Sequence, residues 1–401
     1  FIEGAKGNNI VIGSRAALFA PLTDLQSIIL LDDSYEQLKE DRSPKWRAID
    51  VAKLLAKYLK LSLTVISSVP SVSTFDLEGK DERQSSSWPR IYIEDKRNVD
   101  PALGDISNRS VSLIHEAQKQ SLDVAIIINN KSISKLLICK SCETLAVCGN
   151  CGHSVSQMQN NEILVCAACK EQRPAICLEC SGTSFKRYRK GTKASTEDYK
   201  VMFPSANVHE VTSSTVKNVE ENLNMTKQNI FVATEAIFHS AKLCANLGAV
   251  IFQDIDTVMF RPSIVAFDQT LVLINRALRS IKRSEIKTPI FISTKHSTHE
   301  LFSDIRSMDF VANLKKELDV RKNAMLFPYF ATAEIRSEKD SIAELGESIS
   351  KDIFVGIDDE DNESCLLVRA EDHTDLAEKS YEMLRKFASR NKFSLSVDNY
   401  E

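Results

Sequence analysis

The feature that most constrains this chain is a run of cysteines between residues 139 and 180. It holds eight of the ten cysteines as four Cys-x-x-Cys pairs: Cys139/Cys142, Cys148/Cys151, Cys166/Cys169 and Cys177/Cys180. A two-residue spacer lets a tight turn aim both sulfurs at one point, so each pair can supply half of a tetrahedral thiolate site. The four pairs therefore predict two structural zinc sites.

Other interpretations of these cysteines fit the sequence less well. Disulfide-stapled scaffolds are short secreted domains, whereas this chain has 401 residues and confines most of its cysteines to about forty of them. A redox Cys-x-x-Cys normally occurs once, beside a βαβ unit. An iron–sulfur centre stays open, because four thiolates also ligate such clusters. The spacing also leaves open which pair joins which.

Length and charge set broad limits on the chain. Its 401 residues are enough for two or three domains, and 43% hydrophobic with 26% charged residues is ordinary for a globular protein. No apolar run approaches the length of a membrane span. The net charge of −4 disfavours a uniformly basic nucleic-acid coat, so such binding would be local. Because Phe1 opens a strand-like stretch, we expect the sequence to begin inside a longer chain.

Short apolar runs that end in polar residues alternate with helical patterns along most of the chain. Such runs are typical of buried parallel strands, and their alternation with helices predicts doubly wound α/β lobes. Strands are expected over 9–12, 28–31, 61–66, 91–93, 123–128, 229–234, 249–252 and 289–293, and helices over 48–60, 107–120 and 264–281. The polar stretch 76–89 is expected to link two lobes. The cysteines interrupt the second lobe, which predicts that the zinc module is an insertion into it.

The pattern changes beyond about residue 300 and predicts a small α+β domain. Helices are expected over 310–321 and 372–389, strands over 352–357 and 366–369, and a turn into a strand at 325–330. The acidic run 358–363 is expected to be a solvated loop. The expected domains are 1–88, 89–300 interrupted by the module 136–190, and 301–401.

The cysteine array and its flanks resemble the PriA family of bacterial replication-restart helicases, also called primosomal protein N-prime. Several stretches outside the cysteines carry the same resemblance in the same order: IGSRAALFAP at 12–21, SSVPS at 67–71, Gly191-Thr192 ahead of Phe203-Pro204, DID at 254–256 before FRP at 260–262, and residues 314–329. The resemblance implies two RecA-like lobes, the first one incomplete, a double zinc ribbon inserted in the second, and a small C-terminal domain. It also implies a nested set of zinc ligands, with Cys139, Cys142, Cys177 and Cys180 on one ion and Cys148, Cys151, Cys166 and Cys169 on the other.

The residues at the family's motor motifs depart from the pattern. The family's DEEH is reduced to Asp32 and Asp33, its SAT loses the threonine at Val69, and its QVAGRAGR keeps only Arg276 and Arg279 among bulkier residues. Its GTQ reads Ala-Thr-Glu at 233–235. No phosphate loop occurs in these residues, although the resemblance places that loop upstream of Phe1. Because phosphoryl transfer needs all its parts placed together, we expect the motor to be lost, with no catalytic residue and no requirement for ATP or Mg²⁺. The two acids are then a polar strand end and the two arginines an exposed helix face.

A basic segment follows the last cysteine pair. Lys186, Arg187, Arg189, Lys190 and Lys193 could neutralise phosphates while Phe185 or Tyr188 stacks on an unpaired base. The same composition suits a solvated loop. The resemblance favours DNA contact, because the family's corresponding segment joins the ribbons to a DNA-facing lobe, and it adds Lys131 as a further candidate.

The remaining histidines and cysteines carry no clear site. His153 is surplus as a zinc ligand, and His239, His296 and His299 form no ligand spacing with Cys244. Cys244 and Cys365 are expected to be core residues. No Ser/His/Asp arrangement supports hydrolase chemistry.

The resemblance therefore implies a cytoplasmic, nucleoid-associated protein that binds forked or single-stranded DNA and nucleates primosome assembly. The partners it implies are primosome proteins, single-stranded DNA-binding protein and the replicative helicase, with no membrane partner. Two alternatives stay open: an active ATP-dependent 3′–5′ DNA helicase with divergent motifs, and a zinc-ribbon adaptor between proteins.

Overall fold

A computed structural model gives the fold. It describes residues 10–22, 24–34, 38–40, 46–69, 71–72, 74, 88–98, 106–128, 137–157, 162–166, 169, 171–187, 192–224, 226–261, 265–282, 288–307, 309–338, 354–356, 363–387 and 394–397. The chain forms two compact units, one from Phe1–Arg83 with Leu314–Asn399 and the other from Gln84–Asn313 with Tyr400–Glu401. Within the described ranges, no helix is long and apolar enough to cross a membrane.

The centre of the second unit is a six-stranded, all-parallel sheet with the order β12-β13-β6-β14-β15-β5. Its strands are β5 (Ile91–Asp95), β6 (Asp123–Ile127), β12 (Asn207–Val211), β13 (Asn229–Ala233), β14 (Leu247–Phe252) and β15 (Ile290–Thr294). Strands β6, β13 and β15 are buried at every position, as parallel strands covered on both faces are. This RecA-like sheet confirms the expected α/β fold.

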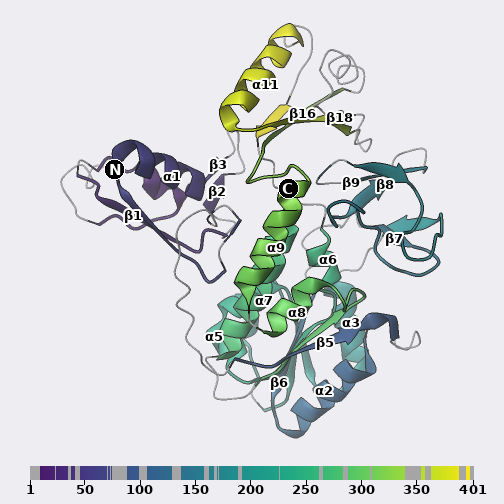
Figure 1. The fold of residues 1–401 in the computed structure, drawn as a ribbon. Coiled ribbons are helices and arrows are strands. Elements are labelled where there is room, and N and C mark those ends of the chain that lie inside the picture. Colours follow the sequence, from purple (N-terminus) through teal and green to yellow (C-terminus); the bar gives the residue numbers. More distant parts are fainter. Residues whose placement is uncertain are drawn as a thin grey trace. The chain divides into compact units, whose positions relative to one another are not determined.

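Helices cover both faces of this sheet (Figure 1), with α2 and α3 on one side and α5 and α7 on the other. The elements outside the sheet are η4 (Lys96–Asn98), α2 (Asn108–Lys119), α3 (Thr192–Met202), α4 (Val216–Glu221), η6 (Glu235–His239), α5 (Ala241–Cys244), α6 (Asp256–Met259), α7 (Ala266–Lys282) and α8 (Glu300–Arg306). Helix α9 (Phe310–Asn323) begins in this unit, and its residues from Leu314 onward belong to the first unit. Ser107 caps α2, because its side chain accepts a hydrogen bond from the Ser110 N–H. Ile114 of α2 and Tyr199 of α3 are fully buried against the sheet residues Ile126 and Ile251.

The first unit contains a second, smaller parallel pairing. Its N-terminal elements are η2 (Arg15–Phe19), β1 (Ser27–Leu31), β2 (Lys39–Glu40), β3 (Trp46–Arg47), α1 (Ala48–Leu59) and β4 (Ser62–Ile66), with β1 parallel to β4. Helix α1 buries Ala48 and Ile49 against Leu30. It ends at Lys60, whose backbone is left-handed and whose N–H bonds the Ala56 carbonyl.

Two expectations for this N-terminal part are wrong. The described residues of the expected strand 9–12 form no strand, and Ile12 is 93% exposed. An apolar run becomes a strand only where a neighbour satisfies its backbone, and β1 is paired only with β4 among the described residues. Strand β1 is also open on one face, where Ile29 and Leu31 are exposed, and so alternates rather than being wholly buried.

The C-terminal part of the first unit is an antiparallel sheet with one long helix, as the α+β expectation stated. Its order is β17-β18-β16-β19, from β16 (Ala331–Glu338), β17 (Phe354–Gly356), β18 (Glu363–Ala370) and β19 (Ser394–Val397), and α11 (His373–Phe387) packs on β16 and β18. The expected linker 76–89 lies outside the described residues except at 88–89, as do residues 358–362 of the acidic run.

Candidate metal centre

All four cysteine pairs lie in turns with the same backbone hydrogen bond. In each turn the leading cysteine donates its N–H to the carbonyl five residues further on. The four bonds are Cys139 to Thr144 (2.9 Å), Cys148 to His153 (2.7 Å), Cys166 to Glu171 (2.9 Å) and Cys177 to Gly182 (2.8 Å). This shared turn presents the two sulfurs of each pair on the same side of the backbone, so the Cys-x-x-Cys spacing acts as a local structural unit.

A second bond closes three of these turns. Glu143, Gly152 and Ser181 each follow the second cysteine of a pair, and each donates its N–H to the carbonyl of the first cysteine at 3.0 Å. Their φ angles are 56°, 74° and 60°, in the left-handed region that glycine adopts without strain. A glutamate and a serine are less usual there, so the turn geometry is retained at some conformational cost.

Short strands hold the turns together. The ends of the module, β7 (Leu137–Cys139) and β11 (Phe185–Arg187), pair antiparallel, with Cys139 opposite Phe185. Between them β8 (Val155–Gln157), β9 (Ile163–Cys166) and β10 (Gln172–Pro174) form a three-stranded antiparallel sheet. The module thus lies between β6 and α3 of the parallel-sheet unit.

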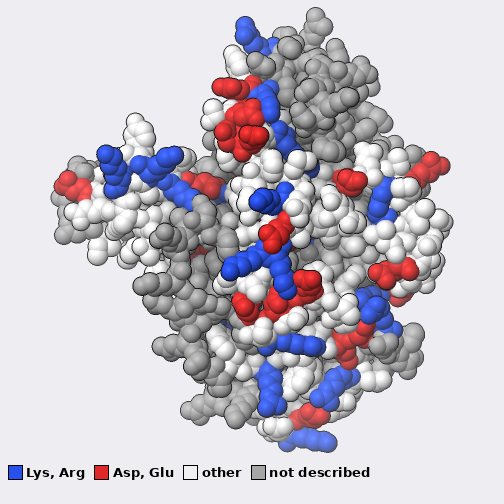
Figure 2. All heavy atoms as spheres, in the orientation of Figure 1, with Lys and Arg blue, Asp and Glu red and all other residues white. Residues whose placement is uncertain are grey.

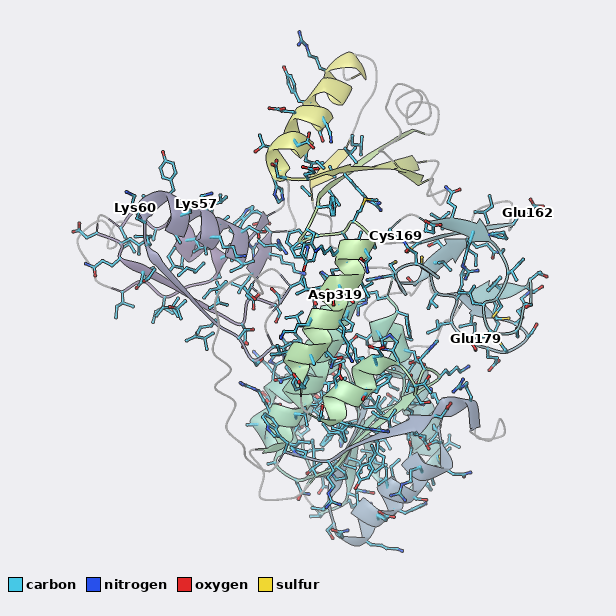
Figure 3. The ribbon with its side chains drawn as sticks, in the orientation of Figure 1. Lys57, Lys60, Glu162, Cys169, Glu179 and Asp319 are labelled. Carbon is cyan, nitrogen blue, oxygen red and sulfur yellow. The ribbon has the colours of Figure 1, made fainter. Side chains whose placement is uncertain are left out.

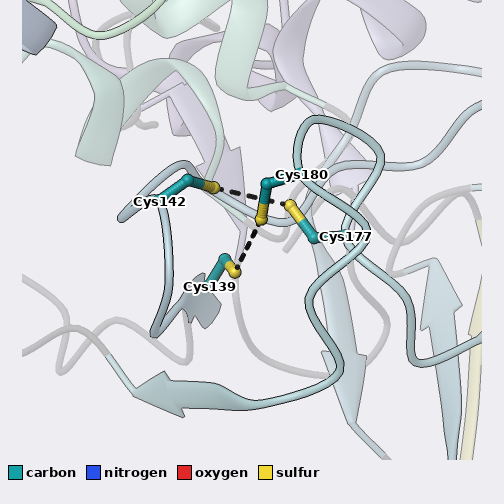
Figure 4. Close-up of side chains that lie close together, drawn as sticks. All are labelled: Cys139, Cys142, Cys177 and Cys180. Carbon is teal, nitrogen blue, oxygen red and sulfur yellow. Dashed lines mark hydrogen bonds between the residues drawn. The ribbon is translucent and has the colours of Figure 1, made fainter.

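The turns bring the eight sulfurs together as two groups of four. One tetrad, here called outer, contains Cys139, Cys142, Cys177 and Cys180, and the other, here called inner, contains Cys148, Cys151, Cys166 and Cys169. In each group the sulfurs all lie within 4.8 Å of one another. In the outer tetrad Cys139 Sγ is 3.6 Å from Cys180 Sγ, and Cys142 Sγ is 3.6 Å from Cys177 Sγ (Figure 4).

These separations fit a tetrahedral zinc site. With zinc–sulfur bonds of about 2.3 Å, the sulfurs of a tetrahedron are about 3.8 Å apart. The inner pairs Cys148/Cys169 and Cys151/Cys166 lie at 3.6 and 3.4 Å. A disulfide needs about 2.05 Å, and the nine cysteines whose side chains are described are free. Both tetrads can therefore hold zinc, which when bound would crosslink the turns and stabilise the fold of the module.

Within each tetrad, the thiols shift one another's pKa values. Hydrogen bonding from Cys151 lowers the pKa of Cys148, and the same contact with Cys148 raises the pKa of Cys151. In the outer tetrad burial opposes ionisation of Cys142, but hydrogen bonds from Thr144 lower its pKa to about 6. Four thiolates this close repel one another unless a cation lies among them, so the donor set suits a divalent ion.

Arg173 of β10 links the two tetrads. Its Nη2 donates to the Val147 carbonyl at 2.9 Å, next to Cys148 of the inner tetrad, and its Nη1 donates to the Ile176 carbonyl, next to Cys177 of the outer one. Burial lowers the pKa of Arg173, whereas the charges of Cys148 and Cys177 raise it. The guanidinium therefore compensates thiolate charge from both tetrads.

The backbone of Gly182 lies so close to the sulfurs of the outer tetrad that there is little room for a side chain. A Cβ at this position would lie 3.0 Å from Ser141 Oγ, 3.2 Å from Cys139 Sγ and 3.3 Å from Cys180 Sγ. The sequence reasoning missed this residue. Its position, five residues after Cys177 in the repeated turn, is the signal that could have found it.

The basic segment is only partly described. Lys186 is exposed and its Nζ lies 3.2 Å from Glu143 Oε1. Arg187 is in β11 and Lys193 in α3, without described side chains, while Arg189, Lys190, Tyr188 and Lys131 lie outside the described residues. Phe185 is 9% exposed, which contradicts its expected role as a stacking surface, because β11 packs its ring inside the module.

The altered motor positions are already engaged within their own units. Asp32 accepts hydrogen bonds from the Ser68 N–H and hydroxyl at 3.0 and 3.2 Å. Asp33 is buried rather than a simple polar strand end, and Ser71 donates to it. Arg276 Nη1 lies 3.0 Å from Glu235 Oε2, so this arginine is half-buried and ion-paired, whereas Arg279 is exposed as expected.

The structure also locates other histidines and cysteines considered in the sequence. His153 is buried and its Nδ1 lies 3.1 Å from the Cys151 carbonyl, outside the tetrads. Cys244 is a buried residue, and burial raises its pKa to about 12. Cys365 lies in β18, where its side chain is not described. Figure 3 labels Cys169 in the module together with Glu162 and Glu179 on its loops.

The fold and the tetrads define a class of protein: a RecA-like α/β lobe that carries an inserted double ribbon with two tetrathiolate sites. No protein-family model matches the chain. The chain is similar to curated proteins that share the name Replication restart protein PriA. Replication restart protein PriA of Haemophilus influenzae is 23% identical over 350 residues, covering 82% of this chain and 47% of that protein.

Similar values hold for relatives in other bacteria. Replication restart protein PriA of Bacillus subtilis is 21% identical over 362 residues, covering 85% of this chain and 45% of that protein. The Thermotoga maritima protein of the same name is 23% identical over 336 residues, covering 80% and 45%. The chain thus spans about half the length of the curated relatives it matches.

Proposed function

We propose that this chain acts in replication restart, by binding branched or single-stranded DNA and nucleating primosome assembly without a working helicase motor. The observation that carries the proposal is the combination of two intact tetrads with PriA-like similarity over about four fifths of the chain. The eight thiolates hold two structural zinc ions in the nested arrangement. Primosome proteins, single-stranded DNA-binding protein and the replicative helicase are the proposed partners.

DNA contact is assigned to the basic segment that leaves the ribbon. Figure 2 shows basic and acidic side chains mixed over most of the visible face, with some basic ones gathered over α1. With a net charge of −4, phosphate contacts have to come from a local cluster. Lys186, Arg187, Arg189, Lys190 and Lys193 form such a cluster in the sequence. Because each phosphate neutralised releases counterions, binding should weaken steeply with salt.

Loss of the motor is supported by the partners of the motif residues. The carboxylate of Asp33 is buried with Ser71, and Arg276 is paired with Glu235 within the same unit. Hydrolysis of a nucleotide would need both groups to be available for Mg²⁺ and phosphate. DNA-stimulated ATP hydrolysis by the full chain should therefore be at background, and clear turnover would favour the divergent-helicase alternative.

The DNA-binding assignment is tested with a labelled fork and a labelled single strand. We expect the variant with alanine at Lys186, Arg187, Arg189 and Lys190 to bind both more weakly and with a smaller salt slope. A matched control replaces four exposed lysines elsewhere: Lys57, Lys119, Lys200 and Lys217. If the segment variant binds like the control, DNA contact through this segment is refuted. If the wild type binds neither probe, the protein-adaptor alternative takes its place.

A further inference from the structure

Glu143 in the outer tetrad's first turn is held between two lysines from distant parts of the chain. Lys186 Nζ lies 3.2 Å from Glu143 Oε1, and Lys295 Nζ lies 3.5 Å from Glu143 Oε2. Lys295 also donates to the Glu143 backbone carbonyl at 2.8 Å. The two ammonium groups thus converge on the two oxygens of one carboxylate.

The same contact joins the zinc module to the parallel sheet. Lys295 follows the last residue of β15, and its backbone N–H donates to the buried Asp256 Oδ2 at 2.8 Å. Its backbone is therefore fixed at the carboxyl edge of the sheet, where ligands of open α/β sheets bind. Arg97, just beyond β5 on the same edge, is paired with Asp95 at 2.7 Å.

The Glu143 ion pairs are open to competition. Glu143 is 58% exposed, Lys186 46% and Lys295 26%, so water and salt screen both pairs. A phosphodiester, like a carboxylate, presents two anionic oxygens on one atom, and it can accept from the same two ammonium groups. Glu143 thus has the charge and shape of a stand-in for a backbone phosphate.

We propose that Lys186 and Lys295 form a site for a nucleic-acid backbone phosphate, and that Glu143 occupies this site until DNA displaces it. The inference rests on the proposed DNA-binding function and adds Lys295, which the basic segment does not contain. Displacing the Glu143 side chain removes one ionic link between the outer tetrad and the sheet, while the Lys295 bond to the Glu143 carbonyl remains. DNA binding is therefore coupled to the strength of the link between the zinc module and the parallel sheet.

The test measures binding of a labelled single-stranded oligonucleotide to the full chain at several salt concentrations. Glu143→Gln removes the competing charge but keeps the backbone bond to Lys295, so it should raise affinity about two- to fivefold. Lys295→Ala should lower affinity and reduce the salt slope by about one. In the double variant the gain from Glu143→Gln should shrink or vanish.

Matched controls come from the Lys200–Glu197 pair on α3, whose Nζ–Oε1 distance is 2.8 Å. Lys200→Ala and Glu197→Gln should leave binding unchanged, and zinc content should stay at the wild-type level in every variant. If the wild type binds the oligonucleotide, two results would overturn the site. One is an unchanged affinity of Glu143→Gln, and the other is an affinity of Lys295→Ala equal to that of Lys200→Ala. No binding of the oligonucleotide by the wild type or by Glu143→Gln would overturn the site, and no binding of the labelled fork either would refute the proposed function.

A further experiment distinguishes a phosphate of the nucleic-acid backbone from a free phosphate compound. Inorganic pyrophosphate should compete with the oligonucleotide only weakly, because a single phosphate site offers few contacts. Tight pyrophosphate binding that Lys295→Ala abolishes would assign the lysines to a free phosphate compound and overturn the nucleic-acid assignment.

Discussion

Replacing Gly182 by alanine is expected to weaken zinc binding at the outer tetrad alone. The added Cβ would lie 3.2 Å from Cys139 Sγ and 3.3 Å from Cys180 Sγ. Both are tighter than ordinary carbon–sulfur contact, so the sulfurs must move by a few tenths of an ångström or the turn must open. The third neighbour, Ser141 Oγ at 3.0 Å, can rotate away, whereas ligand sulfurs held by a metal cannot.

The size of the effect follows from the tolerance of tetrahedral sites. Changes beside metal ligands typically cost about 10- to 100-fold in metal affinity, which corresponds to about 1.4–2.7 kcal/mol. The same substitution at Gly149 is the matched control, because the nearest atom to its added Cβ is Leu178 Cδ1 at 3.9 Å, an ordinary contact. Gly149 lies in a turn of the inner tetrad and has a backbone outside the left-handed region.

The assay is competition with a graded chelator, with released zinc read by a metal-sensitive dye. Wild type and Gly149→Ala should release about two zinc ions per chain along similar curves. Gly182→Ala should release about one of them at a roughly 10- to 100-fold lower chelator strength. Coincident curves for all three proteins would refute the argument that Gly182 is set by its distance to the sulfurs, and loss of both ions together would show that the tetrads are not separable.

Three further outcomes are expected. Gly248→Ala in β14 should lower the free energy of unfolding by about 1–3 kcal/mol, measured in urea, because its Cβ would lie 2.7 Å from Leu122 Cβ; an unchanged midpoint would contradict this. Burial raises the folded-state pKa of Asp123 above 3.8, so its stabilising contribution is complete below the unfolded pKa and is lost as pH rises through the folded one. The stability of the wild type relative to Asp123→Asn should therefore fall with rising pH, and parallel curves would contradict that sign. Excess chelator should unfold the ribbon while the parallel sheet keeps its circular dichroism, and simultaneous loss of both would show that the metal sites stabilise the whole unit.

Most of the parallel sheet could be predicted because its strands are buried on both faces. Strands β6, β13, β14 and β15 are mostly apolar runs, and such runs give a clear signal without knowledge of neighbours. The edge strand β12 (NVHEV) was missed, since an edge strand exposes one side and mixes polar with apolar residues. At 9–12 the opposite error occurred, because an apolar run does not say whether a partner strand exists.

The parts of the candidate site that depend on local sequence could be predicted, whereas the contacts between distant residues could not. The Cys-x-x-Cys turns are local, so their number and ligand type could be predicted from spacing. The contact between Lys295 and Glu143 joins residues 152 positions apart, and nothing in either local sequence indicates it. Phe185 was misjudged for the same reason, because its burial depends on the pairing of β11 with β7.

The pairing of β7 with β11 has a consequence for the chain that carries the module. Leu137 lies opposite Arg187, so the two ends of the module are neighbours about 5 Å apart. The module therefore begins and ends at the same place, so its insertion between β6 and α3 does not require these two elements to move apart. We expect that joining these two adjacent ends in place of the module would leave the register of the six-stranded sheet intact.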